Sequence, residues 1–181
     1  GGDIAAWCVL RGLTVTLQDQ SLAQVAAAVG RAGKLFERRL RDPLARRAAF
    51  DRLIPDPSGE GARHADVVIE AIFEDLAAKQ ALFRHLEGLV RPDAVLASNT
   101  SSLDLDELAA TTSRPADVIG AHFFSPANVM RLLEVVRGKK TSKEVLASTL
   151  KLSKTLKKLA VVSGVCDGFI GNRMVDFYLR Q

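Results

Sequence analysis

The sequence has little of what marks several specialised protein classes. Its 181 residues include two cysteines, one tryptophan and one tyrosine. Cys8 and Cys166 lie among apolar residues without the spacing of metal ligands, so we expect reduced intracellular thiols and no metal site. No apolar run approaches the length of a membrane span, and there is no internal repeat or low-complexity tract. These absences exclude disulfide scaffolds, zinc modules and membrane-spanning proteins.

The chain does not begin with methionine, and no signal peptide precedes its first helical stretch. We therefore expect a piece of a longer protein. The composition itself is that of an ordinary globular domain, since 48% of the residues are hydrophobic and 25% are charged. A chain of this length can bury a substantial core.

The net charge of +4 is spread unevenly along the chain. One basic cluster consists of Arg31, Lys34, Arg38, Arg39, Arg41, Arg46, Arg47 and Arg52. The other consists of Lys139, Lys140, Lys143, Lys151, Lys154, Lys157 and Lys158. Each can be a solvated helix face or a site for a polyanionic small molecule. Aromatic residues are scarce nearby, so no base-stacking platform is evident and we expect no nucleic-acid partner.

Helical and strand patterns alternate through the chain, which is typical of an α/β fold with a doubly wound, mostly parallel sheet of the Rossmann type. Periodicity predicts helices over residues 1–11, 21–40, 43–54, 74–90, 103–111 and 141–159. Strands are predicted at 13–18, 65–72, 94–98, 118–124, 132–136 and 160–163. Helices 21–40 and 43–54 are long for a simple crossover, so we expect them to project as a helical hairpin.

The amino-terminal segment carries a weak nucleotide-binding signal. A helix, the terminating Gly12 and a strand precede Asp19. A dinucleotide fold places an acid at this point, where it accepts hydrogen bonds from the adenosine ribose. An Asp after a strand is also commonly a loop residue or a helix cap. The glycine fingerprint is incomplete, and we expect Gly1 to be its last glycine and the first strand to be truncated.

Two residues between Val118 and Arg137 contradict the usual rules of burial. His122 closes a strand of small and apolar residues, and Glu134 interrupts the apolar run LLEVV. A buried carboxylate is costly unless it is paired, and an imidazole is a natural partner. We therefore expect Glu134 to hold the His122 ring as an acid–base dyad. The alternative is a structural histidine at a strand end.

Two polar segments have both a structural and a functional interpretation. Residues 98–102, SNTSS, follow a buried strand where such sheets bind ligands, while Ser101 and Asp104 fit a capping box for the next helix. In GFIGNRM, Gly168 and Gly171 predict close backbone approach. Asn172 there is either an ordinary helix residue or one that points into a site.

Together these segments resemble the NAD-binding domain of the L-3-hydroxyacyl-CoA dehydrogenases. AHFFSPANVMRLLEVV resembles that family's His-Phe-Phe-Asn-Pro motif and the Glu-containing strand after it. LQDQ, VIEAIFEDLAAK, SNTSS and GFIGNRM match further family segments in the same order, so the likeness covers nearly the whole chain. The segments HFFSPA and FIGNRM are most similar to those of multifunctional β-oxidation enzymes, both the peroxisomal bifunctional type and the bacterial α-subunits.

The resemblance implies NAD-dependent interconversion of L-3-hydroxyacyl-CoA and 3-ketoacyl-CoA. It implies a general base, His122, oriented by Glu134, with Ser101 on the substrate oxygen or nicotinamide ribose and Asn172 positioning the acyl chain. The cofactor contacts that it implies are Gly1, Asp19, Gln20, Ala71, Ile72, Phe73, Glu74, Lys79, Asn99, Ser101 and Ser125. Ser125 stands where most of the family has Asn, although peroxisomal-type members also have Ser. We expect His64 and His85 to be surface residues.

The family pattern implies an NAD-binding domain over residues 1–166. Residues 167–181 would begin the linker and first helix of a missing C-terminal helical domain, which closes over acyl-CoA and forms the dimer. The parent would be a homo-oligomer or part of a β-oxidation complex, cytoplasmic in a bacterium or peroxisomal or mitochondrial in a eukaryote. Two other readings are a non-catalytic nucleotide-binding or assembly module and a dehydrogenase for short 3-hydroxybutyryl-CoA or a CoA-free hydroxy acid.

Overall fold

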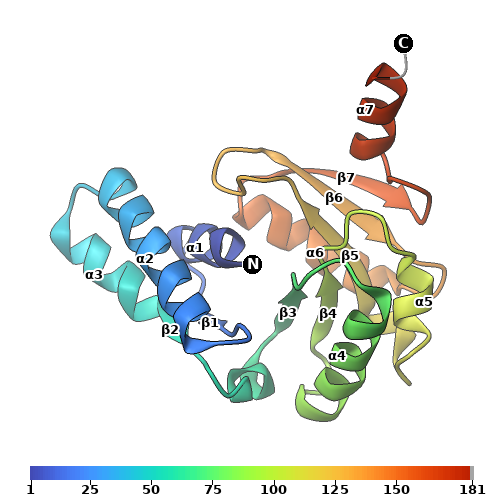
Figure 1. The fold of residues 1–181 in the computed structure, drawn as a ribbon, viewed down its shortest axis with the longest axis horizontal. Coiled ribbons are helices and arrows are strands. Elements are labelled where there is room, and N and C mark those ends of the chain that lie inside the picture. The colour runs from blue at the N-terminus through green and yellow to red at the C-terminus, as the bar shows by residue number, and fades with distance from the viewer. Residues whose placement is uncertain (180–181) are drawn as a thin grey trace. The chain divides into compact units, whose positions relative to one another are not determined.

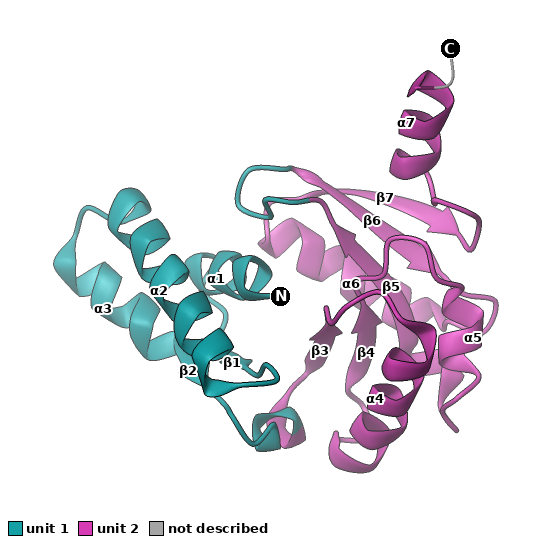
Figure 2. Cartoon of the chain, in the orientation of Figure 1, with its two compact units in different colours: residues 1–62, 125–130 teal, residues 63–124, 131–181 magenta. Residues whose placement is uncertain are grey.

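The computed structural model describes residues 1–179 and divides into two compact units, residues 1–62 with 125–130 and residues 63–124 with 131–179 (Figure 2). Each unit has its own sheet, and helices connect most of the successive strands (Figure 1). The predicted α/β class with a mostly parallel Rossmann-type sheet is confirmed.

The first unit combines three helices and two short parallel strands. Its elements are α1 (Gly2–Leu10), β1 (Val15–Leu17), α2 (Leu22–Arg39), α3 (Pro43–Arg52) and β2 (Leu53–Pro55). Gly12 has a φ of 89°, a conformation that glycine adopts without strain, and it turns the chain from α1 into β1. Small residues of α1 and α2 pack together with Phe36 into the core of this unit.

One strand of the first unit was not predicted. Residues 53–55 were expected to finish a helix ending near Ile54, but α3 ends at Arg52 and Leu53–Pro55 pairs in parallel with β1. Three residues are too few for a periodic pattern, so the pairing partner decides their conformation. The predicted hairpin of two helices is present as α2 and α3, which pack against each other.

The second unit contains a five-stranded sheet in the order β3-β4-β5-β6-β7. The strands are β3 (Val67–Glu70), β4 (Val95–Ser98), β5 (Val118–Phe123), β6 (Leu132–Arg137) and β7 (Leu159–Gly164). All neighbours run parallel except β5 and β6, which are antiparallel. The carboxyl ends of β3, β4 and β5 therefore lie at the same end of the sheet as the amino ends of β6 and β7.

Helices α4 (Leu76–Leu89), α5 (Leu105–Ala109), α6 (Lys143–Thr155) and α7 (Gly171–Leu179) complete this unit, with short 3₁₀ turns η1 (Glu60–His64) and η2 (Pro115–Asp117). Helix α6 packs on β5, β6 and β7, and α5 packs on β5 and α4. Strands β4 and β5 are buried along their whole length, whereas β3, at the sheet edge, is only partly buried up to Glu70. The partial burial of β3 follows from its place at the end of the strand order, where β4 is its neighbour on one side.

The predicted capping box of Ser101 and Asp104 was also wrong. The N-cap of α5 is Asp104, whose carboxylate accepts the N–H groups of Asp106 and Glu107. The N-cap of α6 is Ser142, while Thr141 instead donates its hydroxyl to the Val118 carbonyl. In both cases several Ser, Thr and Asp residues are adjacent, and the tertiary contacts of the neighbours select which one caps.

Candidate active site

The antiparallel register of β5 and β6 places His122 directly opposite Glu134. The imidazole Nδ1 lies 2.7 Å from the carboxylate Oε2, and both side chains are buried. Directly opposed residues in such a pair have adjacent side chains, so the strand register alone brings the two groups together. This is the pair that the apolar run with a single Glu predicts.

The second oxygen of Glu134 binds the start of α7. Oε1 accepts the backbone N–H of Ile170 at 2.9 Å and that of Gly171 at 2.6 Å. A Cβ at Gly171 would lie 2.6 Å from Cζ of Phe124, so only glycine permits this approach. Glu134 thus has hydrogen-bond donors on both oxygens, which compensates the burial of its charge.

The His122 ring lies between aromatic residues. Its centroid is 4.5 Å from the ring of Phe124 and 6.1 Å from that of Phe169. With Nδ1–H donated to Glu134, the other ring nitrogen, Nε2, carries the lone pair of a neutral imidazole. The arrangement can therefore accept a proton at Nε2 and stabilise the resulting imidazolium through Glu134.

Asn172, in the first turn of α7, joins this region to the loop after β4. Its Nδ2 donates to the Ser101 carbonyl at 3.2 Å. The segment that begins α7 consequently holds two groups at once, the Glu134 carboxylate through backbone N–H groups and the Ser101 backbone through an amide.

Glu74 also binds the loop that contains Ser101. Its Oε1 accepts the backbone N–H groups of Ser101 at 2.8 Å and Ser102 at 3.2 Å, and the Thr100 hydroxyl also donates to it. Burial by itself would raise the pKa of Glu74, but the hydrogen bonds from Thr100 and Ser101 and the charge of Lys79 outweigh it. The pKa of Glu74 therefore lies below its ordinary value, and the group is an anion at neutral pH.

The other residues predicted at the cofactor site lie in different parts of the fold. Asn99 bridges two strand ends, since its Oδ1 accepts the Phe123 N–H at 2.8 Å. Phe73 is exposed and Lys79 is buried. The partly buried Ala71 and Ile72 connect β3 to Glu74. Four predicted residues belong to the first unit instead, namely Gly1, Asp19, Gln20 and Ser125.

Within the first unit, Gly1 is the N-cap of α1 and Asp19 is exposed after β1, where its Oδ1 accepts the N–H of Gln20. Ser125 is exposed at the start of the loop that leaves β5. His64 and His85, which were expected at the surface, are both exposed.

Sequence reasoning missed the buried polar residues that support this site, Glu70 and Ser98. Glu70 ends β3 and is 3% exposed, and its Oε2 accepts the hydroxyl of fully buried Ser98 at 2.7 Å. A signal was present, because Lys79 occupies a core position of α4 at helical spacing from Leu76 and Phe83. A lysine there requires a buried anion, and Glu70 is the acid at the end of the preceding strand.

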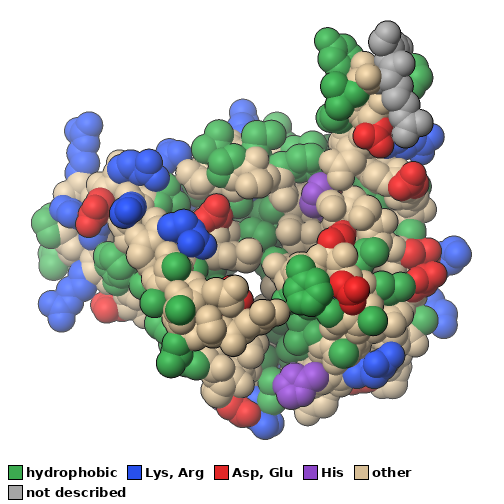
Figure 3. All heavy atoms as spheres, in the orientation of Figure 1, with side chains coloured by type: hydrophobic (Ala, Val, Ile, Leu, Met, Phe, Trp, Pro, Cys, Tyr) green, Lys and Arg blue, Asp and Glu red, His purple; other side chains and the backbone are tan. Residues whose placement is uncertain are grey.

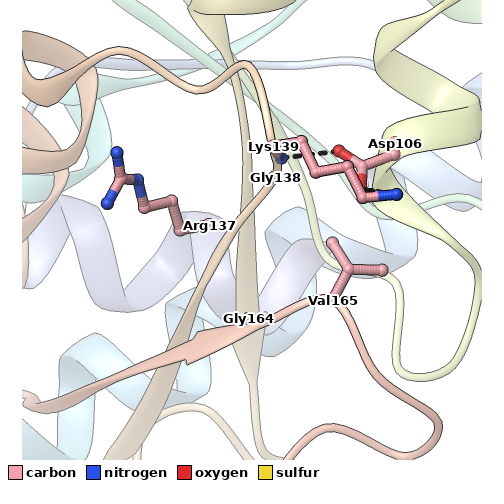
Figure 4. A pocket seen from close by; sticks show the side chains of 6 residues that line it. All are labelled: Asp106, Arg137, Gly138, Lys139, Gly164 and Val165. Carbon is pink, nitrogen blue, oxygen red and sulfur yellow. Dashed lines mark hydrogen bonds and ion pairs between the residues drawn. The ribbon is translucent and has the colours of Figure 1, made fainter.

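A shallow pocket of about 290 Å³ lies elsewhere, among Asp106, Arg137, Gly138, Lys139, Gly164 and Val165 (Figure 4). In this view Lys139 approaches Asp106, whereas the Arg137 side chain points away from both. Arg137 ends β6 and Gly164 ends β7. The pocket therefore lies at the end of the sheet opposite to the one where His122 lies. It is separate from the dyad.

The described residues contain neither a metal-binding cluster nor a membrane-spanning helix. Across residues 1–179, no group of three or more His, Cys, Asp or Glu side chains is placed to hold a metal ion. No helix in that range is long and apolar enough to cross a membrane.

A Rossmann-type sheet with a histidine–carboxylate dyad and a polar loop at its ligand-binding edge defines a nucleotide-binding oxidoreductase domain. Residues 1–166 match the family model of the 3-hydroxyacyl-CoA dehydrogenase NAD-binding domain. The chain belongs to this family, whose cofactor is NAD.

Similar proteins agree with this assignment. The chain is 53% identical to a peroxisomal bifunctional enzyme of Danio rerio over 66% of its own length and 17% of that protein. It is 36% identical to the fatty acid oxidation complex subunit alpha of Psychrobacter sp. (strain PRwf-1), covering 98% of the chain and 25% of the relative. The chain thus spans a quarter or less of these two relatives.

Solved structures show the same fold. FadB2 of M. tuberculosis superposes with a TM-score of 0.93 at 34% identity, over 98% of this chain and 65% of that one. (S)-3-hydroxybutyryl-CoA dehydrogenase PaaH1 of Ralstonia eutropha gives a TM-score of 0.91, also at 34% identity, over 97% of this chain and 63% of that one.

Proposed function

We propose that the protein containing this chain catalyses NAD-dependent oxidation of L-3-hydroxyacyl-CoA to 3-ketoacyl-CoA in fatty-acid β-oxidation. The observation that carries the proposal is the buried His122–Glu134 dyad within a family domain that binds NAD. The relatives named peroxisomal bifunctional enzyme and fatty acid oxidation complex subunit alpha support the same reaction class.

In this proposal, Nε2 of His122 takes the proton of the 3-hydroxyl group while the C3–H bond breaks. Bound NAD would supply the acceptor for the hydride that leaves C3, which balances the two electrons lost as the carbonyl forms. Glu134 holds Nδ1–H throughout and stabilises the imidazolium. Ser101 is the group that contacts the substrate oxygen or the nicotinamide ribose, and Asn172 keeps the Ser101 backbone in place.

The residues present fit a dinucleotide. Glu74 is a partly exposed anion at the carboxyl edge of the sheet, where such folds bind nucleotides. Asp19 follows β1, at the position where this fold places the acid for the adenosine ribose. In the second unit the proposed cofactor contacts are Ala71, Ile72, Phe73 and Asn99, with Lys79 supporting Glu74 from the buried side, and in the first unit they are Gly1, Gln20 and Ser125. Ser125 stands in place of the Asn that most of the family resembled here has, so a hydroxyl replaces a carboxamide at this position.

We also propose that residues 1–166 form the cofactor domain and that residues 167–181 begin a helical substrate and dimerisation domain. Helix α7 supports this, because Met174, Phe177 and Tyr178 are exposed along it. Residues 180 and 181 of that proposed segment lie outside the described part of the chain. A further strand before Gly1 would extend the short β1–β2 pair, which alone is a marginal sheet. The proposed compartment is the bacterial cytoplasm or, in a eukaryote, the peroxisome or mitochondrion.

The test is NADH oxidation with acetoacetyl-CoA by the full-length protein that contains this chain. His122→Ala should lower kcat by about 10²- to 10⁴-fold, the usual contribution of a general base. His85→Ala is the matched control, since His85 is an exposed histidine on α4, and it should leave the rate unchanged. Equal rates for wild type and His122→Ala would remove the assignment of His122 as the base, whereas a wild type that binds NADH without turnover would favour a non-catalytic nucleotide-binding or assembly module.

A short-chain 3-hydroxybutyryl-CoA dehydrogenase is the second candidate, because a solved relative of this fold carries that name. Comparing kcat/KM for acetoacetyl-CoA and a long-chain 3-ketoacyl-CoA separates the two. Activity on a free 3-keto acid at a similar rate would instead indicate a CoA-independent hydroxy acid dehydrogenase.

A further inference from the structure

A buried ion pair lies behind the Ser101 loop, between the end of β3 and α4. Nζ of Lys79 is 2.6 Å from Oε1 of Glu70, and both side chains are 1% exposed. Glu70 is held firmly, since Oε1 also accepts the N–H of Ile72 at 2.7 Å and Oε2 accepts the Ser98 hydroxyl at 2.7 Å. The carboxylate therefore joins β3, β4 and α4.

The ammonium group of Lys79 is fully used by the protein. It donates to Glu70 Oε1 and to the Ile72 carbonyl at 3.2 Å, and it lies 3.4 Å from Oε2 of Glu74. An ammonium has three donors, and these three acceptors account for them. Lys79 thus acts on the cofactor region through Glu74 rather than by presenting a free N–H to a ligand.

Glu74 is the one member of this group with substantial exposure, with 34% of its side chain accessible. Its two oxygens have separate partners. Oε2 faces Lys79, and Oε1 accepts N–H groups of Ser101 and Ser102. A continuous path of polar contacts accordingly runs from Glu70 through Lys79 and Glu74 to the Ser101 backbone.

We propose that Glu70 is a positioning residue, which fixes the Lys79 ammonium beneath Glu74 and thereby sets the place of Ser101 in the cofactor site. The inference rests on the proposed function, in which Ser101 contacts the substrate oxygen or the nicotinamide ribose. A buried ion pair is weak as a source of stability, because desolvation offsets the attraction. The role of the pair here is to fix positions. Glu70 restrains the Lys79 ammonium, which would otherwise move toward Glu74 and draw the Glu74 carboxylate away from the Ser101 loop.

Glu70→Gln is the informative variant, because it removes the charge and keeps the shape. The amide oxygen still accepts from Lys79 and Ile72, and the amide N–H₂ donates to Ser98, whose hydroxyl can also accept. The measurement is the Kd for NADH, from fluorescence titration of the full-length protein. We expect the Kd to rise by about tenfold, as for the loss of one charge-assisted interaction.

A double-variant cycle tests the route of the effect. If Glu70 acts through Glu74, Glu70→Gln should add little to the Kd once Glu74→Gln is present. Additive effects would overturn the proposal, because Glu70 would then act independently of Glu74. Glu87→Gln is the matched control, since Glu87 also accepts a loop N–H, that of Ser113 at 2.6 Å, away from Ser101.

Urea unfolding of the same samples separates positioning from a purely structural role. A tenfold change in Kd with a folded protein supports the proposal, whereas a Kd that rises only in proportion to the unfolded fraction overturns it. If Glu70→Gln does not fold, Glu70→Asp keeps the charge and shortens its reach, and an unchanged Kd would then refute the idea. A wild type that fails to bind NADH would end the proposed function as well, while an unchanged Glu70→Gln Kd would end this inference alone.

Discussion

At the scale of residues, the site depends on carboxylates whose two oxygens have different tasks. Glu134 gives one oxygen to His122 and the other to the start of α7. Glu74 likewise divides its oxygens between Lys79 and the Ser101 loop. Because each carboxylate is fixed by donors on both sides, the groups that it orients have one position each.

The first prediction at this scale concerns Glu134→Gln. The amide oxygen would keep the N–H groups of Ile170 and Gly171, so the amide N–H₂ would face Nδ1 of His122. Nδ1 would then accept, Nε2 would carry the proton, and the base would be lost. We expect kcat to fall by about 10²- to 10⁴-fold.

The control is Glu144→Gln, on the exposed first turn of α6. It should retain the wild-type kcat, and both variants should show nearly the wild-type urea midpoint. A Glu134→Gln enzyme with full activity would show that the tautomer of His122 does not matter for the reaction.

Acid stability should depend on Glu74. Its pKa is lower in the folded protein than in an unfolded chain, so the unfolded state binds more protons in acid. The stabilisation is present above the ordinary glutamate pKa of about 4.3 and disappears as the pH falls through the lower folded value. Urea midpoints measured between neutral pH and acid should therefore fall more steeply for wild type than for Glu74→Gln. Parallel curves would contradict this.

At the scale of elements, one strand register and one helix start create the site. The β5–β6 register determines the dyad, and the start of α7 supplies N–H groups to Glu134 and the Asn172 amide to Ser101. Helix α7 carries exposed apolar residues along its length, Met174, Val175, Phe177, Tyr178 and Leu179. A helix of this length is only marginally stable in isolation, and packing its apolar face against a partner surface would stabilise it.

We predict that amide hydrogens of α7 exchange more slowly in the full-length protein than in the 181-residue chain, by about tenfold or more, because packing suppresses local opening. Hydrogen exchange followed by mass spectrometry measures this directly. The buried part of α2, around Ala32 and Phe36, is the internal reference and should exchange equally in both. Equal exchange in α7 would argue against a following domain that covers it.

At the scale of the whole molecule, one of the two basic clusters lies on the α2–α3 hairpin. Lys and Arg side chains gather over this part of the first unit (Figure 3), including the exposed Arg38, Arg39 and Arg41. CoA is a polyanion, and a basic surface raises the rate of encounter with such a ligand over a range set by the salt concentration.

We predict that reversing the charge of Arg38, Arg39 and Arg41 to Glu raises the KM for acetoacetyl-CoA by about five- to tenfold at low salt. The difference should shrink as salt is added, because screening removes long-range attraction. Lys151→Glu with Lys154→Glu on α6 is the control and should change KM little. An unchanged KM in the hairpin variant would refute a role in CoA attraction.

Apart from the short strand β2, the sequence by itself determined the order of the main helices and strands, because periodicity and glycine turns are local properties. It also predicted the His122–Glu134 pair, since a single carboxylate in an apolar run must find a buried partner. The family motifs indicated Ser101 and Asn172. The first lies in the loop after a strand and the second in the first turn of a helix.

Only the tertiary structure decided which polar groups meet. Strand β2 forms because β1 is beside it, and Ser142 rather than Thr141 caps α6 because the Thr141 hydroxyl is engaged by Val118. The Glu70–Lys79 pair joins residues nine apart on different elements, and its path to Ser101 crosses two strand ends. Hydrogen bonds of this kind depend on distances in three dimensions, which the spacing of residues along the chain does not encode.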